Sequence, residues 1–177
     1  MKILILNPLL YSGSNNEIPK VDTIKDTMIY SMCLGFKSLG HQVTLVAMEC
    51  YKPVKDEVYD FEILFFKTNF DRILNAALPL SFSLNRYIKE NAKKFDLIIS
   101  SEVFAFHSLC AALAAPAKTV IWHELALHQR KFFKIPSKLW YNVIARLLMK
   151  NVFVIPRSEA SMKFIRHYLK RVSDVPV

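Results

Sequence analysis

The chain has 177 residues, enough for one domain with a buried core, and its 53% hydrophobic and 22% charged residues are an ordinary globular balance. Its formal net charge of +9 favours an anionic partner such as phosphate groups, nucleic acid or an anionic membrane surface. The scattered cysteines Cys33, Cys50 and Cys110 argue against a disulfide framework, and no apolar run approaches the roughly 18 residues of a membrane span.

The first half of the chain predicts three strands and one long helix before residue 67. A first strand at 2–6 is followed by a polar loop at 7–20. A helical period begins near Thr23, and Gly40 provides the C-terminal cap. The apolar face of this helix is predicted to hold Met28, Met32, Cys33, Phe36 and Leu39. Further strands are predicted at 42–47 and 61–66.

The second half alternates strands and helices. Residues 69–94 read as a helix interrupted near Pro79, and residues 95–100 as a strand that runs into an apolar helix at 103–114. A short strand at 119–122 ends in His123. Ser137 is predicted to cap a helix that runs to about residue 150, and Ser158 to cap one that runs to about residue 171. The last strand lies between them at 151–156.

Strands that are near-continuous apolar runs and alternate with helices predict βαβ units on a parallel sheet. We therefore expect an α/β fold of the Rossmann-like, doubly wound kind, with a mainly parallel sheet of about six strands and helices on both faces.

Several familiar site motifs are absent from the sequence. With only Gly13, Gly35 and Gly40, the chain cannot form G-x-G-x-x-G after its first strand, a P-loop or a G-x-S-x-G nucleophile elbow. His123 and His128 are five residues apart, whereas the zinc motif H-E-x-x-H needs histidines four apart on one helix face. We therefore predict no metal site.

The best site candidates are polar residues that end predicted strands, because ligands of open α/β sheets bind beyond the carboxyl ends of the strands. His123 can either bond to the backbone at the strand end or donate to a sugar hydroxyl or phosphate oxygen, and we favour the second. Glu124 follows it directly. Ser101 and Glu102 end another predicted strand.

The loop after the first strand is a further candidate. Gly13, Ser14 and Asn15 lie where α/β folds place their ligand loop, and backbone N–H groups near a helix start suit an anion. A solvated polar loop explains these residues equally well.

Residues 128–171 are strongly basic, and Glu159 is their one acid. Basic residues interleaved with aromatics suit an anionic membrane surface, and we place this contact at Phe132, Phe133 and Lys134. The helix that follows is expected to pack its apolar face on the sheet. This face is predicted to hold Leu139, Trp140, Val143, Ile144, Leu147 and Leu148. Nucleic acid is disfavoured because no recognition motif accompanies the charge.

Taken in order, these segments resemble the N-terminal domain of GT-B glycosyltransferases of family 4. The resemblance rests on residues 1–6 (MKILIL), 36–46 (FKSLGHQVTLV), 95–101 (FDLIISS), 120–124 (VIWHE) and 152–158 (VFVIPRS). The segment LGHQV at 39–43 and the strand-ending His123 are the most specific pieces.

The resemblance implies a nucleotide-sugar donor, used as a substrate, and no cofactor. It implies that His123 lies near the transferred sugar, and that Gly13 and Ser14 lie near the donor diphosphate. The family often has two adjacent glycines in that loop, and this chain has one. The expected substrate-binding set is Gly13, Ser14, Asn15, Ser101, Glu102, Glu124 and Arg157.

It also implies that residues 1–177 are a single N-terminal, acceptor-side domain whose C-terminal donor-binding domain is absent, so that this chain alone is expected to be inactive. The whole enzyme would move a sugar to a glycan or lipid-linked acceptor in cell-surface polysaccharide or glycolipid synthesis. Retention is favoured because no second carboxylate base is evident. We expect a cytoplasmic protein that contacts the inner face of the membrane peripherally.

Two other readings remain open at this point. The chain could be a non-catalytic Rossmann-like binding domain, or a membrane-recruiting subunit of a split glycosyltransferase.

Overall fold

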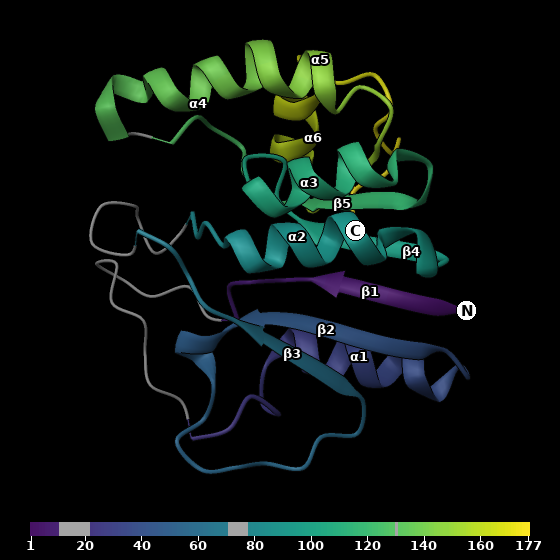
Figure 1. Cartoon of the computed structure of the whole chain (residues 1–177). Helices are drawn as coiled ribbons and strands as arrows, with labels where there is room; N and C mark the ends of the chain where they lie inside the picture. The colour runs from purple at the N-terminus through teal and green to yellow at the C-terminus, as the bar shows by residue number, and fades with distance from the viewer. Residues whose placement is uncertain (11–21, 71–77, 130) are drawn as a thin grey trace. The chain divides into compact units, whose positions relative to one another are not determined.

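The computed structural model describes residues 1–10, 22–70, 78–129 and 131–177 (Figure 1). The chain divides into two compact units, residues 1–98 and 99–177.

Six strands form one sheet in the order β3-β2-β1-β4-β5-β6. Their bounds are Lys2–Leu6 (β1), Gln42–Met48 (β2), Glu62–Phe66 (β3), Leu97–Ser101 (β4), Thr119–His123 (β5) and Phe153–Pro156 (β6). The pairs β1–β2, β2–β3 and β5–β6 are parallel. This is the doubly wound strand order of Rossmann-like folds, which confirms the predicted fold class.

In the first unit, β1 is buried along all but its first residue, and β2 pairs with it from Lys2 opposite Gln42 to Leu6 opposite Val46. Helix α1, Met28–Ser38, contacts β2. Its first turn is capped by the Thr27 hydroxyl, which accepts from the N–H of Tyr30 at 3.2 Å. The chain leaves the helix through Gly40, whose φ of +81° favours glycine.

The predicted apolar face of α1 is partly wrong. Cys33 is fully buried as predicted, but Met28 and Leu39 are exposed, and Ile29 and Tyr30 are buried in their place. The sequence of this helix is apolar around most of its circumference, so the face that β2 covers decides which residues become core.

The next elements are the short 3₁₀ helix η2 (Glu49–Tyr51), helix α2 (Phe82–Asn91) and the 3₁₀ turn η3 (Ala92–Lys94). The second half of the helix predicted at 69–94 is confirmed, and the Ser81 hydroxyl caps α2. At its predicted start, Asn69 instead pairs with Leu80 in an isolated antiparallel bridge. Residues 71–77 lie outside the described residues.

In the second unit, β5 and β6 pair from Val120 opposite Phe153 to His123 opposite Pro156. Helix α3, Phe106–Ala114, leads through η4, Pro116–Lys118, into β5. The Thr119 hydroxyl donates to the carbonyl of Ala115 at 2.8 Å, which fixes the start of β5 against the end of the helix. Val103, Ile121, Val154 and Ile165 are core residues of this unit.

A helical run follows β5. It consists of η5 (Lys131–Lys134), α4 (Ile135–Leu139), the π-helical segment η6 (Trp140–Ala145) and α5 (Arg146–Leu148). The predicted cap at Ser137 is wrong. Ser137 lies inside α4, where its buried hydroxyl contacts Nδ1 of His128 at 3.1 Å. The hydroxyl that the sequence predicts as a helix cap therefore makes a tertiary contact instead.

The predicted packing of this run is also wrong in part. Trp140 is buried as expected, but Leu139, Val143, Leu147 and Leu148 are exposed. The residues that join Trp140 in the core are Tyr141, Ala145 and Met149.

Helix α6, Glu159–Arg166, begins as predicted at Ser158. Ser158 and Ser161 form a reciprocal capping box, in which each hydroxyl accepts from the backbone N–H of the other. The helix ends at Arg166, earlier than the predicted residue 171. Within the described part of the chain, no helix is long and apolar enough to cross a membrane.

Candidate functional site

The site begins with the turn after β4, where Glu102 has a left-handed backbone with φ of +63°. Few residues other than glycine adopt this conformation, and in folded proteins it often occurs at functional positions. The Glu102 N–H donates to the carbonyl of Trp122 at 2.9 Å. This bond ties the turn to β5 and brings the Glu102 carboxylate to the end of that strand.

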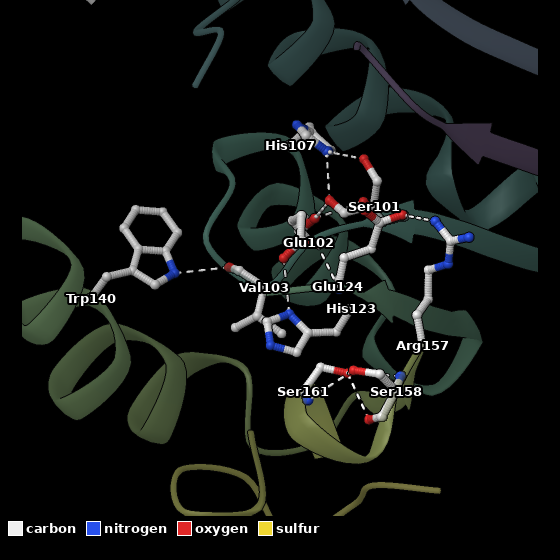
Figure 2. Close-up of polar contacts among 12 residues, drawn as sticks. Ser101, Glu102, Val103, His107, His123, Glu124, Trp140, Arg157, Ser158 and Ser161 are labelled. Carbon is white, nitrogen blue, oxygen red and sulfur yellow. Dashed lines mark hydrogen bonds and ion pairs between the residues drawn. The ribbon is translucent and has the colours of Figure 1, made fainter. Parts of the chain in front are cut away.

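His123 is the last residue of β5, and its ring is fully buried. Nδ1 lies 2.9 Å from Oε2 of Glu102, an ion-pair distance without the alignment of a hydrogen bond (Figure 2). Nε2 is also buried, and no residue in the described ranges hydrogen-bonds to it.

Aromatic rings enclose the imidazole of His123. The Phe164 ring is stacked on it with centroids 6.1 Å apart, and the Tyr141 ring lies edge-on at 6.2 Å. Burial raises the pKa of Tyr141 well above its usual range, and the charge of Glu102 raises it further, so the phenol remains neutral. The imidazole thus lies between a carboxylate and an apolar wall.

Glu124 and Arg157 complete the polar cluster. The Arg157 guanidinium donates to the Glu124 carboxylate, and the Glu124 N–H donates to Oε1 of Glu102 at 2.7 Å. The backbone N–H of Arg157, just after β6, donates to the carbonyl of His123 at 2.9 Å. The guanidinium also lies over the Trp122 ring, 4.9 Å from its centroid. Contacts therefore link the ends of β4, β5 and β6.

Ser101 lies beside this cluster, and it contacts a histidine that the sequence interpretation did not select. Nε2 of His107 lies 3.0 Å from the Ser101 carbonyl and 3.5 Å from its hydroxyl. Burial lowers the pKa of His107 to about 4, so the ring is neutral at pH 7. Its position beside Ser108, as one of two polar residues in a mainly apolar helix, was the signal that could have identified it.

The structure brings together Glu102, His123, Glu124 and Arg157, with Ser101 adjacent. Gly13, Ser14 and Asn15 lie outside the described residues, as does the side chain of Phe132. Phe133 and Lys134 are exposed in η5, away from the contacts of the cluster.

His123 and His128, whose spacing does not match the zinc motif, have different partners. His128 contacts Ser137 through Nδ1 and the Tyr168 hydroxyl, at 3.0 Å, through Nε2. Among the residues that the structure describes, no group of three His, Cys, Asp or Glu side chains could hold a metal ion.

This arrangement offers two kinds of recognition chemistry. Carboxylate oxygens accept hydrogen bonds from hydroxyl groups, and a guanidinium binds phosphate or carboxylate groups through paired N–H donors. The Glu102, Glu124 and Arg157 side chains are partly exposed, whereas the His123 ring lies beneath them in the core. The cluster therefore suits a ligand with both hydroxyl and anionic groups.

Comparison with known protein families gives one match. Residues 26–172 match the family described as Glycosyltransferase Family 4. None of the curated proteins compared with the chain matches it.

Proposed function

The chain belongs to glycosyltransferase family 4 as an N-terminal domain of the GT-B type, and we propose that it is the acceptor-side half of an enzyme that uses a nucleotide-sugar donor. The acceptor is a glycan or lipid-linked glycan of cell-surface polysaccharide or glycolipid synthesis. The observation that supports this proposal is the convergence of Glu102, His123, Glu124 and Arg157 at the ends of β4, β5 and β6. In open α/β sheets, ligands bind beyond these strand ends.

The charges of the cluster suit the two parts of the reaction. Sugar transfer leaves a negatively charged diphosphate and requires the acceptor hydroxyl to be held in place. In the proposed complex, the Glu102 and Glu124 carboxylates accept hydrogen bonds from sugar hydroxyls. Arg157 lies at the edge of this set, where its positive charge favours an anionic group.

Retention of anomeric configuration also fits these contacts. An inverting enzyme needs a general base, often a carboxylate, to take the acceptor proton. Glu124 is paired with Arg157, while Glu102 accepts from a backbone N–H and faces His123. Neither carboxylate is placed as a free base, so we propose retaining transfer.

We propose that His123 contacts the transferred sugar. Because its ring is fully buried, this contact requires a local opening of the residues that cover it when substrate binds. With Nδ1 held beside Glu102, Nε2 is the ring atom left for a sugar hydroxyl.

The test uses a protein that contains this chain together with the family's donor-binding domain. We expect His123→Ala to lower kcat about a hundredfold with a smaller effect on KM, because a contact made mainly in the transition state affects kcat. Initial rates of sugar transfer from a panel of nucleotide-sugars measure this effect.

The matched control is His167→Ala, since His167 is exposed after the end of α6. We expect this variant to keep wild-type rates. Wild-type kcat in His123→Ala would remove His123 from the reaction, and loss of activity in both variants would indicate a general effect on stability.

A further inference from the structure

Tyr141 has a buried hydroxyl that the packing of its unit does not use. The whole side chain is buried, and within the described ranges its hydroxyl makes no hydrogen bond. A buried hydroxyl without a partner destabilises the folded chain, because it has given up its hydrogen bonds to water. A phenylalanine would fill the same space without this penalty. The hydroxyl therefore calls for an explanation other than packing.

The ring of Tyr141 belongs to an aromatic cluster around His123, which also includes Phe164 and Tyr168. It lies edge-on to the imidazole, with the two ring centroids 6.2 Å apart, and edge-on to Phe164 at 5.0 Å. The charge of the Glu102 carboxylate also acts on the Tyr141 phenol. The Tyr141 hydroxyl and Nε2 of His123 are thus two buried polar groups of one cluster, and neither has a hydrogen bond to the part of the chain that the structure describes.

The backbone around Tyr141 has an irregularity that often occurs at functional sites. Tyr141 lies in η6, a π-helical segment, and such wide turns are rare and frequently carry functional residues. Next to it, the indole N–H of Trp140 donates to the carbonyl of Val103 at 2.9 Å, as Figure 2 shows. Val103 directly follows Glu102 in the chain. This bond therefore ties the turn that carries Tyr141 to the turn that carries Glu102.

The two groups together suit a hydroxyl ligand. In the neutral imidazole of His123 we assign the proton to Nδ1, because that atom faces the Glu102 carboxylate, and Nε2 is then an acceptor. Burial raises the pKa of the Tyr141 phenol, which stays neutral and can donate. A sugar hydroxyl can donate to Nε2 and accept from the phenol at the same time. A diphosphate oxygen carries no proton at pH 7 and would leave Nε2 without a partner.

We propose that Tyr141 is a second sugar-binding residue of this site, and that it donates a hydrogen bond to the same sugar hydroxyl that donates to Nε2 of His123. This assignment rests on the proposed function, because it places both groups on one bound sugar. Both side chains are buried in the free chain, so the local opening that exposes His123 also exposes Tyr141. Functional sites often give up stability in this way, since a group kept ready for a ligand is not satisfied within the fold.

Tyr141→Phe removes the hydroxyl and keeps the ring. In a protein that contains this chain together with the donor-binding domain, we expect kcat/KM for sugar transfer to fall about tenfold, mainly through KM, because one hydrogen bond to the bound sugar is lost. In the chain alone, we expect an equal or higher thermal midpoint, because a buried hydroxyl without a partner has been removed. Initial rates with nucleotide-sugars and calorimetry measure the two effects.

The matched control is Tyr168→Phe, since Tyr168 belongs to the same aromatic cluster but its hydroxyl has a partner. That hydroxyl lies 3.0 Å from Nε2 of His128, and the Tyr168 and Tyr141 ring centroids are 5.1 Å apart. We expect Tyr168→Phe to lower the thermal midpoint, because the contact with His128 is lost, and to keep wild-type rates of transfer. The control thus loses stability and keeps activity, whereas Tyr141→Phe keeps stability and loses activity.

Two results would overturn this assignment and leave the proposed function standing. One is wild-type kcat/KM in Tyr141→Phe alongside a reduced kcat in His123→Ala, which would mean that the bound sugar does not contact the Tyr141 hydroxyl. The other is a lower thermal midpoint in Tyr141→Phe, as in Tyr168→Phe, which would give the hydroxyl a structural role. If the unsubstituted two-domain protein transfers no sugar from any nucleotide-sugar, the proposed function fails, and the sugar contact of Tyr141 fails with it.

Discussion

At the residue scale, one carboxylate organises the polar cluster. Glu102 accepts from the Glu124 N–H through one oxygen and faces Nδ1 of His123 with the other. Its backbone is left-handed, and its carboxylate lies against the end of β5. The geometry of His123 therefore depends on a residue that precedes it by 21 positions, so that in the proposed reaction Glu102 both orients His123 and binds a sugar hydroxyl.

His107 makes the pH dependence of stability testable. Its pKa falls from 6.5 to about 4 on folding because the ring is buried, so between these values the unfolded chain binds a proton that the native chain does not. Stability is therefore retained above pH 6.5 and is lost as the pH falls toward 4. The loss from this group is at most about 3 kcal/mol.

Urea denaturation of wild type and His107→Gln from pH 4 to 7.5 measures this contribution. We expect the free energy of unfolding of wild type to fall more steeply below pH 6.5 than that of the variant. Parallel curves would show that the ring takes up its proton without cost. The difference between the two proteins cancels the other groups that titrate in this range.

At the element scale, caps and turns decide where helices begin and which face they bury. Ser158 caps α6 through local contacts three residues apart. Ser137 looks similar in sequence but lies inside α4 and bonds to His128, nine positions away in the chain. A serine before an apolar run therefore predicts a helix start only when no distant partner competes for its hydroxyl.

The capping box of α6 can be tested through stability. Ser158→Ala removes the side chain that accepts from the Ser161 N–H, and we expect the free energy of unfolding to fall by about 1 kcal/mol. Ser158→Asp should keep most of the stability because aspartate also accepts at this position. Urea denaturation at pH 7 compares the two variants, and an equal loss in both would show that the box contributes nothing.

At the scale of the whole molecule, the proposed function assigns one part of the transfer chemistry to this chain. The resemblance to the family places the grip on the nucleotide-sugar in a second domain. The described cluster supplies one guanidinium, that of Arg157, which is already paired with Glu124. Most of the positive charge that a leaving diphosphate needs would then come from the donor-binding domain.

The 177 residues by themselves are therefore expected not to transfer sugar. The measurement is product formation from nucleotide-sugars by the isolated chain, alongside a protein that also carries the donor-binding domain. Transfer by the isolated chain at a comparable rate would contradict the division of roles. Activity in neither protein would instead count against the proposed donor class.

The six strands could be predicted from sequence because each strand of a parallel sheet is an apolar run bounded by polar residues, a local property. The same reasoning found His123 at a strand end and marked Glu102 as a candidate, while Arg157 was named only through the family resemblance. It could not show that Glu102 faces His123, since that contact depends on a left-handed turn and a backbone bond to Trp122.

Which face of a helix is exposed could not be predicted from the sequence, for a related reason. Periodicity identifies which residues of a helix lie on the same side. It identifies the side that holds Leu139 and the side that holds Tyr141 equally well. Which side is buried depends on the elements that pack against the helix. In the helical run after β5, Tyr141 is buried in the core and Leu139 is exposed to solvent. Sequence alone determined the elements and the polar strand ends, while tertiary structure decided their partners and faces, because burial is a property of neighbours that are distant in the chain.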